Sequence, residues 1–174
     1  LSLVGSEMCI RDSRTINHYN ISISNKQRHM TVSNPTIEKL IPNWVDLHVE
    51  ALEDNYRKHH IEMHSRPSIG FSQEYANKVL EEVRNGTAKL MKFRAITGKK
   101  YYKVVSQAWD ENRKEYRDQS VTCFIDKKTG EIYKPASWKS PAKHVRYDMR
   151  IISQRERMHN SKFTDWAGGY LYMR

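Results

Sequence analysis

The chain has 174 residues, with 30 Lys or Arg against 20 Asp or Glu and a formal net charge of +10 at pH 7. This length fits one domain that can bury a core without metals or disulfides. The sequence contains no run of about 18 apolar residues, so neither a transmembrane helix nor a membrane partner is expected.

Residues 1–29 lack the pattern of a folded segment. Their first part, LSLVGSEMCIRDS, resembles a translated sequencing adapter, and Arg14–His29 has no apolar period that would bury one face. We therefore expect Met30 to be the first native residue and residues 1–29 to be a non-native arm. The alternative is a genuine disordered arm.

Residues from about 35 to 85 are predicted to form helices. Pro35 suits the first position of a helix, and Pro42 predicts that this first helix is short or kinked. An amphipathic helix is then expected from Trp44 to about His60. Its apolar face is formed by Val45, Val49, Leu52 and Tyr56.

A further helix is expected after the connector at 65–70. Ser72 can cap its N-terminus, and Asn85-Gly86 tolerates the left-handed conformation that ends many helices. Between these two signals, apolar residues recur with a helical period at Tyr75, Ala76, Val79, Leu80 and Val83.

The apolar period changes to two after residue 88, which predicts strands. Thr97–Lys100 and Asp126–Gly130 are predicted turns, the second with Gly130 at a position of positive φ. The polar stretch Asp110–Gln119 is expected to be a mobile loop. The predicted strands are Lys89–Ala95, Tyr101–Trp109, Val121–Asp126 and Glu131–Lys134.

The C-terminal segment, 136–174, is expected to be largely irregular. Within it, Met149–His159 is a candidate helix, and the aromatic tail Phe163–Arg174 is expected to dock on the body of the domain. The sequence therefore predicts a single α+β domain over residues 30–174. Its N-terminal helices (about 35–85) pack on a small antiparallel sheet of three or four strands (about 88–135).

Charge is distributed unevenly along the chain. Residues 36–83 contain nine Asp or Glu and five Lys or Arg, whereas residues 84–174 contain nine and twenty-one. Such segregation favours a polyanionic partner for the second part, and nucleic acid is the partner that we expect. The alternative is a basic protein that binds no polyanion.

Basic and aromatic residues are interleaved in this second part. Lysine and arginine neutralise phosphates and aromatic rings stack on unpaired bases, so the set predicts a sheet surface that binds nucleic acid. The alternative is that the aromatic residues form the core and the lysines a solvated rim. The candidate binding residues are Lys99, Lys100, Lys103, Lys127, Lys128, Lys134, Lys139, Lys143, Arg146, Tyr102, Tyr133 and Trp138.

Two groups with metal or nucleophile chemistry have simpler interpretations. His59, His60 and His64 have HHxxxH spacing, but no further ligand completes a metal site, so we expect solvated histidines. Cys123 lies in an alternating strand and is predicted to be a buried core residue. Because Cys9 belongs to the arm, Cys123 has no disulfide partner, which is typical of a reducing cytoplasm.

The carboxylates Asp126 and Glu131 flank a predicted turn and could serve as an acid and a base. An Asp at this position more often accepts hydrogen bonds from the turn amides. The sequence has no phosphate-binding glycine loop and no GxSxG, HExxH or CxxC motif. We therefore favour a non-enzymatic protein with no catalytic residue, metal or cofactor. A small hydrolase or nuclease is the third alternative, which a pocket holding Asp126, Glu131 and a lysine would favour.

Three strings in the second half carry a resemblance: GKKYYKVV (98–105), SVTCFIDKKTGEIYKPASWKSPAKHVRYDM (120–149) and DWAGGYLYMR (165–174). Together they resemble a set of small uncharacterised proteins encoded by tailed bacteriophages. The resemblance implies a phage protein made in the cytoplasm of the infected bacterial host, and it carries over no catalytic residue. A weaker resemblance, of topology alone, is to the double-stranded-RNA-binding domain, but Pro141 stands where that family has glycine and lysine.

The expected function is non-enzymatic binding of nucleic acid through a basic sheet surface that bears aromatic residues. Affinity should then fall steeply with salt and depend little on base sequence. The alternative is a virion-associated or host-takeover domain that binds a phage or host protein through its acidic helices.

Overall fold

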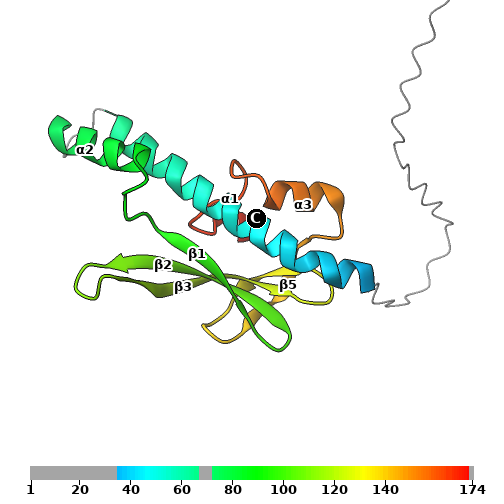
Figure 1. Cartoon of the computed structure of the whole chain (residues 1–174). Helices are drawn as coiled ribbons and strands as arrows, with labels where there is room; N and C mark the ends of the chain where they lie inside the picture. Colours follow the sequence, from blue (N-terminus) through cyan, green and yellow to red (C-terminus); the bar gives the residue numbers. More distant parts are fainter. Residues whose placement is uncertain (1–34, 67–71, 173–174) are drawn as a thin grey trace, which may run out of the picture. The chain divides into compact units, whose positions relative to one another are not determined.

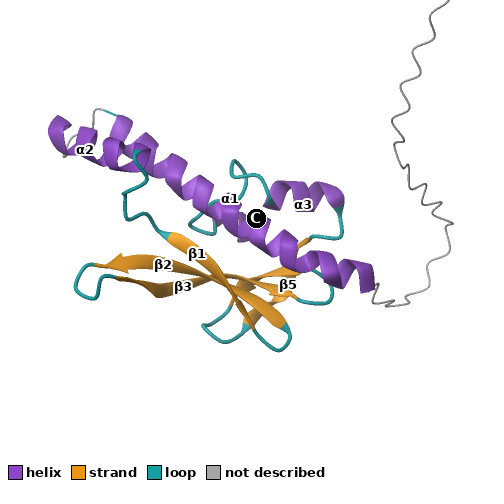
Figure 2. Cartoon of the chain, in the orientation of Figure 1, coloured by secondary structure: helices purple, strands orange, loops and turns teal. Residues whose placement is uncertain are grey.

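The structure is a computed structural model that describes residues 35–66 and 72–172. These residues lie within one compact unit that spans 32–174. The chain order is two helices, an antiparallel sheet and a short helix, which is the predicted α+β class (Figure 1, Figure 2). The predicted arm, 1–29, lies outside the described residues.

Helix α1 spans Pro35–Ser65 with no break at Pro42, so the predicted short first helix is wrong. Proline inside a helix removes a backbone hydrogen bond and costs about 3 kcal/mol. Packing on both sides of Pro42 offsets this cost, because Ile41 and Trp44 are both buried. The fully buried positions of α1 recur at the spacing of one helical face: Ile41, Val45, His48 and Leu52.

Helix α2 (Gln73–Arg84) begins and ends where the sequence predicts. The Oγ atom of Ser72 accepts a hydrogen bond from the backbone amide of Tyr75 at 3.2 Å, which satisfies a free N–H at the helix start. Past the other end, Gly86 has φ +71°, the left-handed conformation that ends the helix. Among the helices of the described residues, none has the length and apolar composition needed to cross a membrane.

The sheet has five antiparallel strands in the order β1-β2-β3-β4-β5, so the prediction of three or four strands is wrong. The predicted loop Asp110–Gln119 is largely strand, because only residues 111–114 form the turn. The fifth strand lies in the segment expected to be irregular. It is an edge strand whose three exposed residues, Lys143, His144 and Val145, are consecutive, which hides the alternation that marks a strand. The strands are β1 (Lys92–Thr97), β2 (Tyr101–Asp110), β3 (Glu115–Asp126), β4 (Glu131–Pro135) and β5 (Pro141–Asp148).

One face of the sheet, which we call the inner face, packs against α1 (Figure 1). A short helix, α3 (Ile152–Met158), lies beside α1 on the same side. Side chains from both helices and from the strands form one buried cluster on this face. The sheet contributes Phe93, Val104, Cys123, Ile125 and Ile132 to it.

The opposite, outer face carries no helix among the described residues. It has a small aromatic cluster instead: the ring of Tyr101 lies 6.1 Å from Phe124 and 5.8 Å from Tyr133, both edge-on. Phe124 is only 4% exposed although it lies on this face. The outer face is therefore partly covered by its own side chains.

The C-terminal segment docks on α1, as predicted. Leu171 belongs to the core, and the ring of Trp166 packs edge-on against Tyr56 at 5.1 Å. Asn55 holds the segment at two points. Its Nδ2 atom donates to the carbonyl of Ser161 at 2.6 Å, and its Oδ1 atom accepts from the amide of Trp166 at 3.0 Å.

His48 is buried where α1, β3 and the C-terminal segment meet. A carbonyl oxygen only accepts, so the Nδ1 atom of His48 carries the proton and donates to Met158 at 2.9 Å. Its Nε2 atom then accepts from the hydroxyl of Tyr170, also at 2.9 Å, and lies 3.7 Å from the Sγ atom of Cys123. Burial lowers the pKa of His48 to about 4 and raises the pKa of Cys123 to about 12. The predicted core position of Cys123 is confirmed.

Candidate functional site

Two hairpin turns meet at one end of the sheet. The turn between β1 and β2 carries Lys99 and Lys100, and the turn between β3 and β4 carries Lys127 and Lys128. The two turns are joined directly, because the backbone amide of Lys127 donates to the carbonyl of Lys100 at 3.0 Å. Two lysine pairs that are distant in sequence are thus fixed as neighbours.

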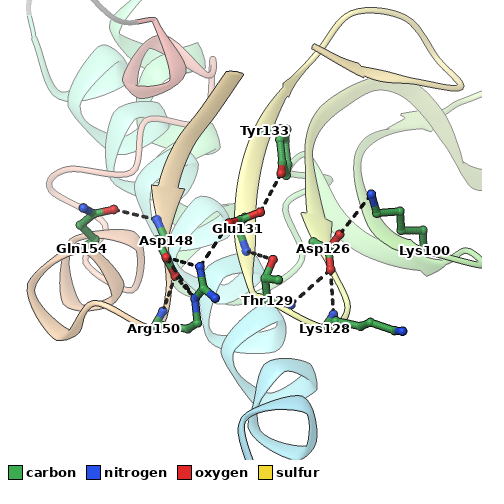
Figure 3. A network of polar contacts seen from close by, with 9 residues as sticks. All are labelled: Lys100, Asp126, Lys128, Thr129, Glu131, Tyr133, Asp148, Arg150 and Gln154. Atoms are coloured by element: carbon green, nitrogen blue, oxygen red, sulfur yellow. Dashed lines mark hydrogen bonds and ion pairs between the residues drawn. The ribbon is translucent and has the colours of Figure 1, made fainter. Parts of the chain in front are cut away.

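Local chemistry explains the shape of the second turn. The Oδ1 atom of Asp126 accepts hydrogen bonds from the backbone amides of Lys128 at 2.8 Å and Thr129 at 3.2 Å (Figure 3). This is the role predicted for an Asp at that position. Gly130 has φ +70°, as predicted, and a Cβ atom there would lie 3.3 Å from the Cβ atom of Met149. The turn is therefore both locally bonded and seated against the core.

A cavity of about 580 Å³ lies between the two turns and the first turn of α1. We call it the lysine pocket. Four lysines and a single carboxylate line it, together with one aromatic ring. Its lining residues are Glu38, Lys99, Lys100, Tyr102, Lys127 and Lys128.

Most of the positive charge of the pocket is not neutralised. The Nζ atom of Lys100 lies 3.8 Å from Asp126, and its side chain is 67% exposed, so this ion pair is loose. Lys127 donates to the carbonyl of Gly98 at 3.3 Å and lies over the ring of Tyr102, at 5.6 Å from the centroid. Within the described part of the chain, Lys99, Lys127 and Lys128 form no ion pair with a carboxylate.

Lys100 is held in its charged form. Its interaction with Tyr101, and beyond that the nearby carboxylates of Asp126 and Glu131, raise its pKa. Lys100 is therefore cationic throughout the physiological pH range.

A carboxylate network adjoins the pocket at Asp126 (Figure 3). Glu131 accepts a hydrogen bond from the hydroxyl of Tyr133 at 2.7 Å. Arg150 bridges Glu131 at 3.2 Å and Asp148 at 2.7 Å, and these two carboxylates are cross-strand neighbours on β4 and β5. The positive charge of Arg150 is thus neutralised by these two carboxylates. These acidic groups hold the ends of β4 and β5 together beside the pocket.

The three predicted stacking residues lie in different surroundings. Trp138 is 43% exposed, and the Nζ atom of Lys103 lies 4.7 Å from the centroid of its ring. Tyr102 packs against the core and also lines the lysine pocket. Tyr133 is held by Glu131 and by the ring of Tyr101. Of the three, Trp138 offers the most open aromatic face.

The remaining predicted residues do not join the pocket. Lys134 lies over Tyr172 of the C-terminal segment, 3.5 Å from the ring centroid, and lines another cavity with it. Lys139 and Lys143 are exposed, before and within the edge strand β5. Arg146 lies at an irregular step of that strand, and its Nε atom is buried without a hydrogen-bond partner among the described residues.

The histidine group has local partners. The rings of His60 and His64 lie 4.5 Å apart, and the Nδ1 atom of His64 lies 2.8 Å from the carbonyl oxygen of His60. Burial is the main cause that lowers the pKa of His60. In residues 35–66 and 72–172, no three potential metal ligands come together.

Two residues of importance were missed from the sequence. His48 has a readable signal, because it follows Ile41 and Val45 at helical spacing on the buried face. Glu38 has none, because its place in the pocket depends on how α1 packs across the sheet. The helical period of the sequence can therefore identify a buried residue such as His48, but it cannot identify a residue such as Glu38 that lines a pocket.

A comparison with protein families finds one match over most of the chain. Residues 20–173 match a family described as a family of unknown function, DUF7717. No curated protein and no solved structure matches the chain.

Proposed function

Because the chain belongs to the family of unknown function DUF7717, we propose its function from its own residues: it binds nucleic acid, without catalysis, through the lysine pocket. One observation carries this proposal. Four lysines from two hairpin turns line one cavity, and three of them form no ion pair with a carboxylate of the described residues. The resemblance of residues 98–174 to tailed-phage proteins supports the cytoplasm of an infected bacterium as the setting.

The pocket suits a polyanion for physical reasons. Ammonium groups that approach phosphates release condensed counterions, and this release supplies most of the sequence-independent affinity for nucleic acid. The backbones that carry the lysines are already fixed by the Lys127–Lys100 hydrogen bond and by the amide contacts of Asp126. Binding therefore orders the lysine side chains alone, which keeps its entropic cost small.

The interface is smaller than the sheet surface expected from the sequence. Lys134 lies beside the C-terminal segment, away from the pocket, and Lys139 and Lys143 lie before and within the edge strand β5. The outer face contributes Trp138, on which an unpaired base can stack while Lys103 holds the other side of the ring. We propose the lysine pocket as the main contact and Trp138 as a second one.

The carboxylates give little support to a hydrolase or nuclease. Asp126 accepts from two turn amides, and Glu131 accepts from Tyr133 while it pairs with Arg150. Each acidic side chain thus has a structural partner. These contacts favour a binding protein over an enzyme.

The test is titration of a labelled single-stranded DNA of about 20 nucleotides, followed by fluorescence anisotropy between about 50 and 200 mM salt. If the pocket neutralises about four phosphates, the slope of log K against log salt should be about −3. The Lys127→Ala/Lys128→Ala variant should bind more weakly, with a slope smaller by about 1.4, because it removes two phosphate contacts.

The matched control is Lys78→Ala/Lys162→Ala, which removes two exposed lysines on α2 and in the C-terminal segment. It lowers the net charge equally and should keep nearly full affinity. Equal weakening by both double variants would contradict a role for the pocket. Absence of binding at low salt would favour the rival function, in which α1 and α2 bind a phage or host protein. Detection of the chain in purified phage particles would support that rival.

A further inference from the structure

We infer that the lysine pocket recognises the phosphorylated end of a nucleic-acid strand, in preference to the phosphates within it. This inference rests on the proposed function and names the ligand of the same site. The shared chemistry is a phosphate group with more than one negative charge. It is carried by a 5′-monophosphate or a 5′-triphosphate terminus.

The first argument is charge density. Each phosphodiester inside a strand has one negative charge, whereas a phosphate monoester has about −1.5 to −2 at pH 7. Four lysines are concentrated around one cavity instead of being spaced along a groove. A concentrated cluster of cations gains most from a single group with several charges.

The second argument is the size of the pocket. Its volume of about 580 Å³ lies within the range of about 300–1,000 Å³ that is typical of small-molecule sites. Such a cavity can take a terminal nucleotide with its phosphates. The ring of Tyr102 gives it an apolar wall, against which the terminal sugar or base can pack.

The third argument is that carboxylates flank the pocket. On one side lie Asp126 and, beyond it, Glu131 and Asp148, which Arg150 bridges (Figure 3). On the α1 side, Glu38 is part of the pocket wall. A strand that entered and left the pocket would bring its phosphates toward these carboxylates, whereas a strand end needs a single exit.

The fourth argument concerns Lys100. Its pair with Asp126 is long, at 3.8 Å, and its side chain is largely exposed. It can turn toward a phosphate at little cost, since exposed ion pairs of this kind are weak. The lysines act here as mobile point charges, which suit the several oxygens of a terminal phosphate.

The experiment compares RNA strands of one sequence that end in a 5′-hydroxyl, a 5′-monophosphate or a 5′-triphosphate, together with a circular strand of that sequence. Wild-type protein should bind the triphosphate strand at least about tenfold more tightly than the hydroxyl strand, with the monophosphate between them. The circular strand should behave like the hydroxyl strand. Lys127→Ala/Lys128→Ala should abolish most of this difference, and Lys78→Ala/Lys162→Ala should keep it.

A pH series adds a readout that does not depend on stability. The second pKa of a phosphate monoester is about 6, so the advantage of the monophosphate strand over the hydroxyl strand should shrink between pH 7.5 and 5.5. The hydroxyl strand, measured at the same pH values, corrects for any change in the protein itself. A constant advantage over this range would contradict recognition of a doubly charged phosphate.

The outcomes separate this inference from the proposed function. If all four strands bind equally and the Lys127→Ala/Lys128→Ala variant weakens them equally, the pocket binds internal phosphates and the end-recognition inference is wrong. If no strand binds, both proposals fail. If inorganic triphosphate competes as strongly as the triphosphate strand, the ligand is a free oligophosphate and strand-end recognition is overturned.

Discussion

The inner face of the sheet and the lysine pocket differ in how their side chains are held. On the inner face, Leu52, Ile125 and Ile132 are fully buried in one packed cluster. In the pocket, Lys99, Lys100 and Lys128 are exposed on short turns. Stability is therefore concentrated in the first region and the capacity to bind a ligand in the second. Substitutions should be able to change one property without the other.

The largest expected effect comes from the inner face. Leu52→Ala removes a fully buried side chain from α1 and should lower the free energy of unfolding by about 2–5 kcal/mol. Denaturant unfolding followed by circular dichroism measures this loss. The folded fraction of the variant should bind nucleic acid with unchanged affinity, and a weaker affinity would show that the two regions are coupled.

The second prediction concerns His48 and acid. Burial lowers the pKa of His48 from 6.5 to about 4. Between these two pH values the side chain is protonated in the unfolded chain and neutral in the folded chain. The contribution of neutral His48 is complete above pH 6.5 and is lost as the pH falls toward 4. The difference corresponds to about 3 kcal/mol.

Thermal unfolding at several pH values tests this prediction. Wild-type protein should lose stability steadily from pH 6.5 to 4. His60 and His159, whose pKa values are also lowered mainly by burial, contribute in the same direction. The His48→Gln variant should be less stable at pH 7 but should have a clearly flatter pH dependence. A slope as steep as that of the wild type would assign the effect to other groups.

The sequence predicted best what local chemistry determines. Ser72 and Gly86 mark the ends of α2, and Asp126 and Gly130 set the turn between β3 and β4. Each of these features depends on residues within a few positions of one another. The α+β class followed from the order of such elements.

The features that could not be predicted from the sequence depend on packing between distant segments. Pro42 is accommodated because residues on both sides of it are buried against the rest of the domain. The lysine pocket requires a hydrogen bond between two turns and the placement of Glu38 by α1. The lysines could be named as candidates, but their convergence could not be predicted from their spacing.

The third prediction concerns Gly130, where the two regions meet. An Ala there would adopt φ +70° and bring its Cβ atom to 3.3 Å from Met149 and 3.6 Å from Ile41. The left-handed conformation alone costs about 1–2 kcal/mol for a residue with a side chain. Gly130→Ala should therefore lower stability by about this amount and also weaken nucleic-acid binding, because it shifts the turn that carries Lys127 and Lys128.

Denaturant unfolding and the anisotropy titration, applied to the same Gly130→Ala sample, test both parts. Gly86→Ala is the matched control. Gly86 also has positive φ, but it lies after α2 and has no atom within 4 Å of an added Cβ. It should lose similar stability and keep full binding. Loss of binding in both variants would mean that reduced stability alone explains the result.

The smallest expected effect on stability belongs to Lys128→Ala. The side chain is exposed and forms no ion pair with a described carboxylate, and the turn is held by the backbone amide of Lys128, which Ala retains. Stability should change by less than about 0.5 kcal/mol. Removal of one phosphate contact should still reduce the slope of log K against log salt for single-stranded DNA by about 0.7.

The control for Lys128→Ala is Lys78→Ala, which removes an exposed lysine on α2 and should leave the slope of log K against log salt unchanged. If the two variants had the same salt dependence, the lysines of the hairpin turns would contribute only to net charge, and the contrast between a region that folds the protein and a region that binds would fail.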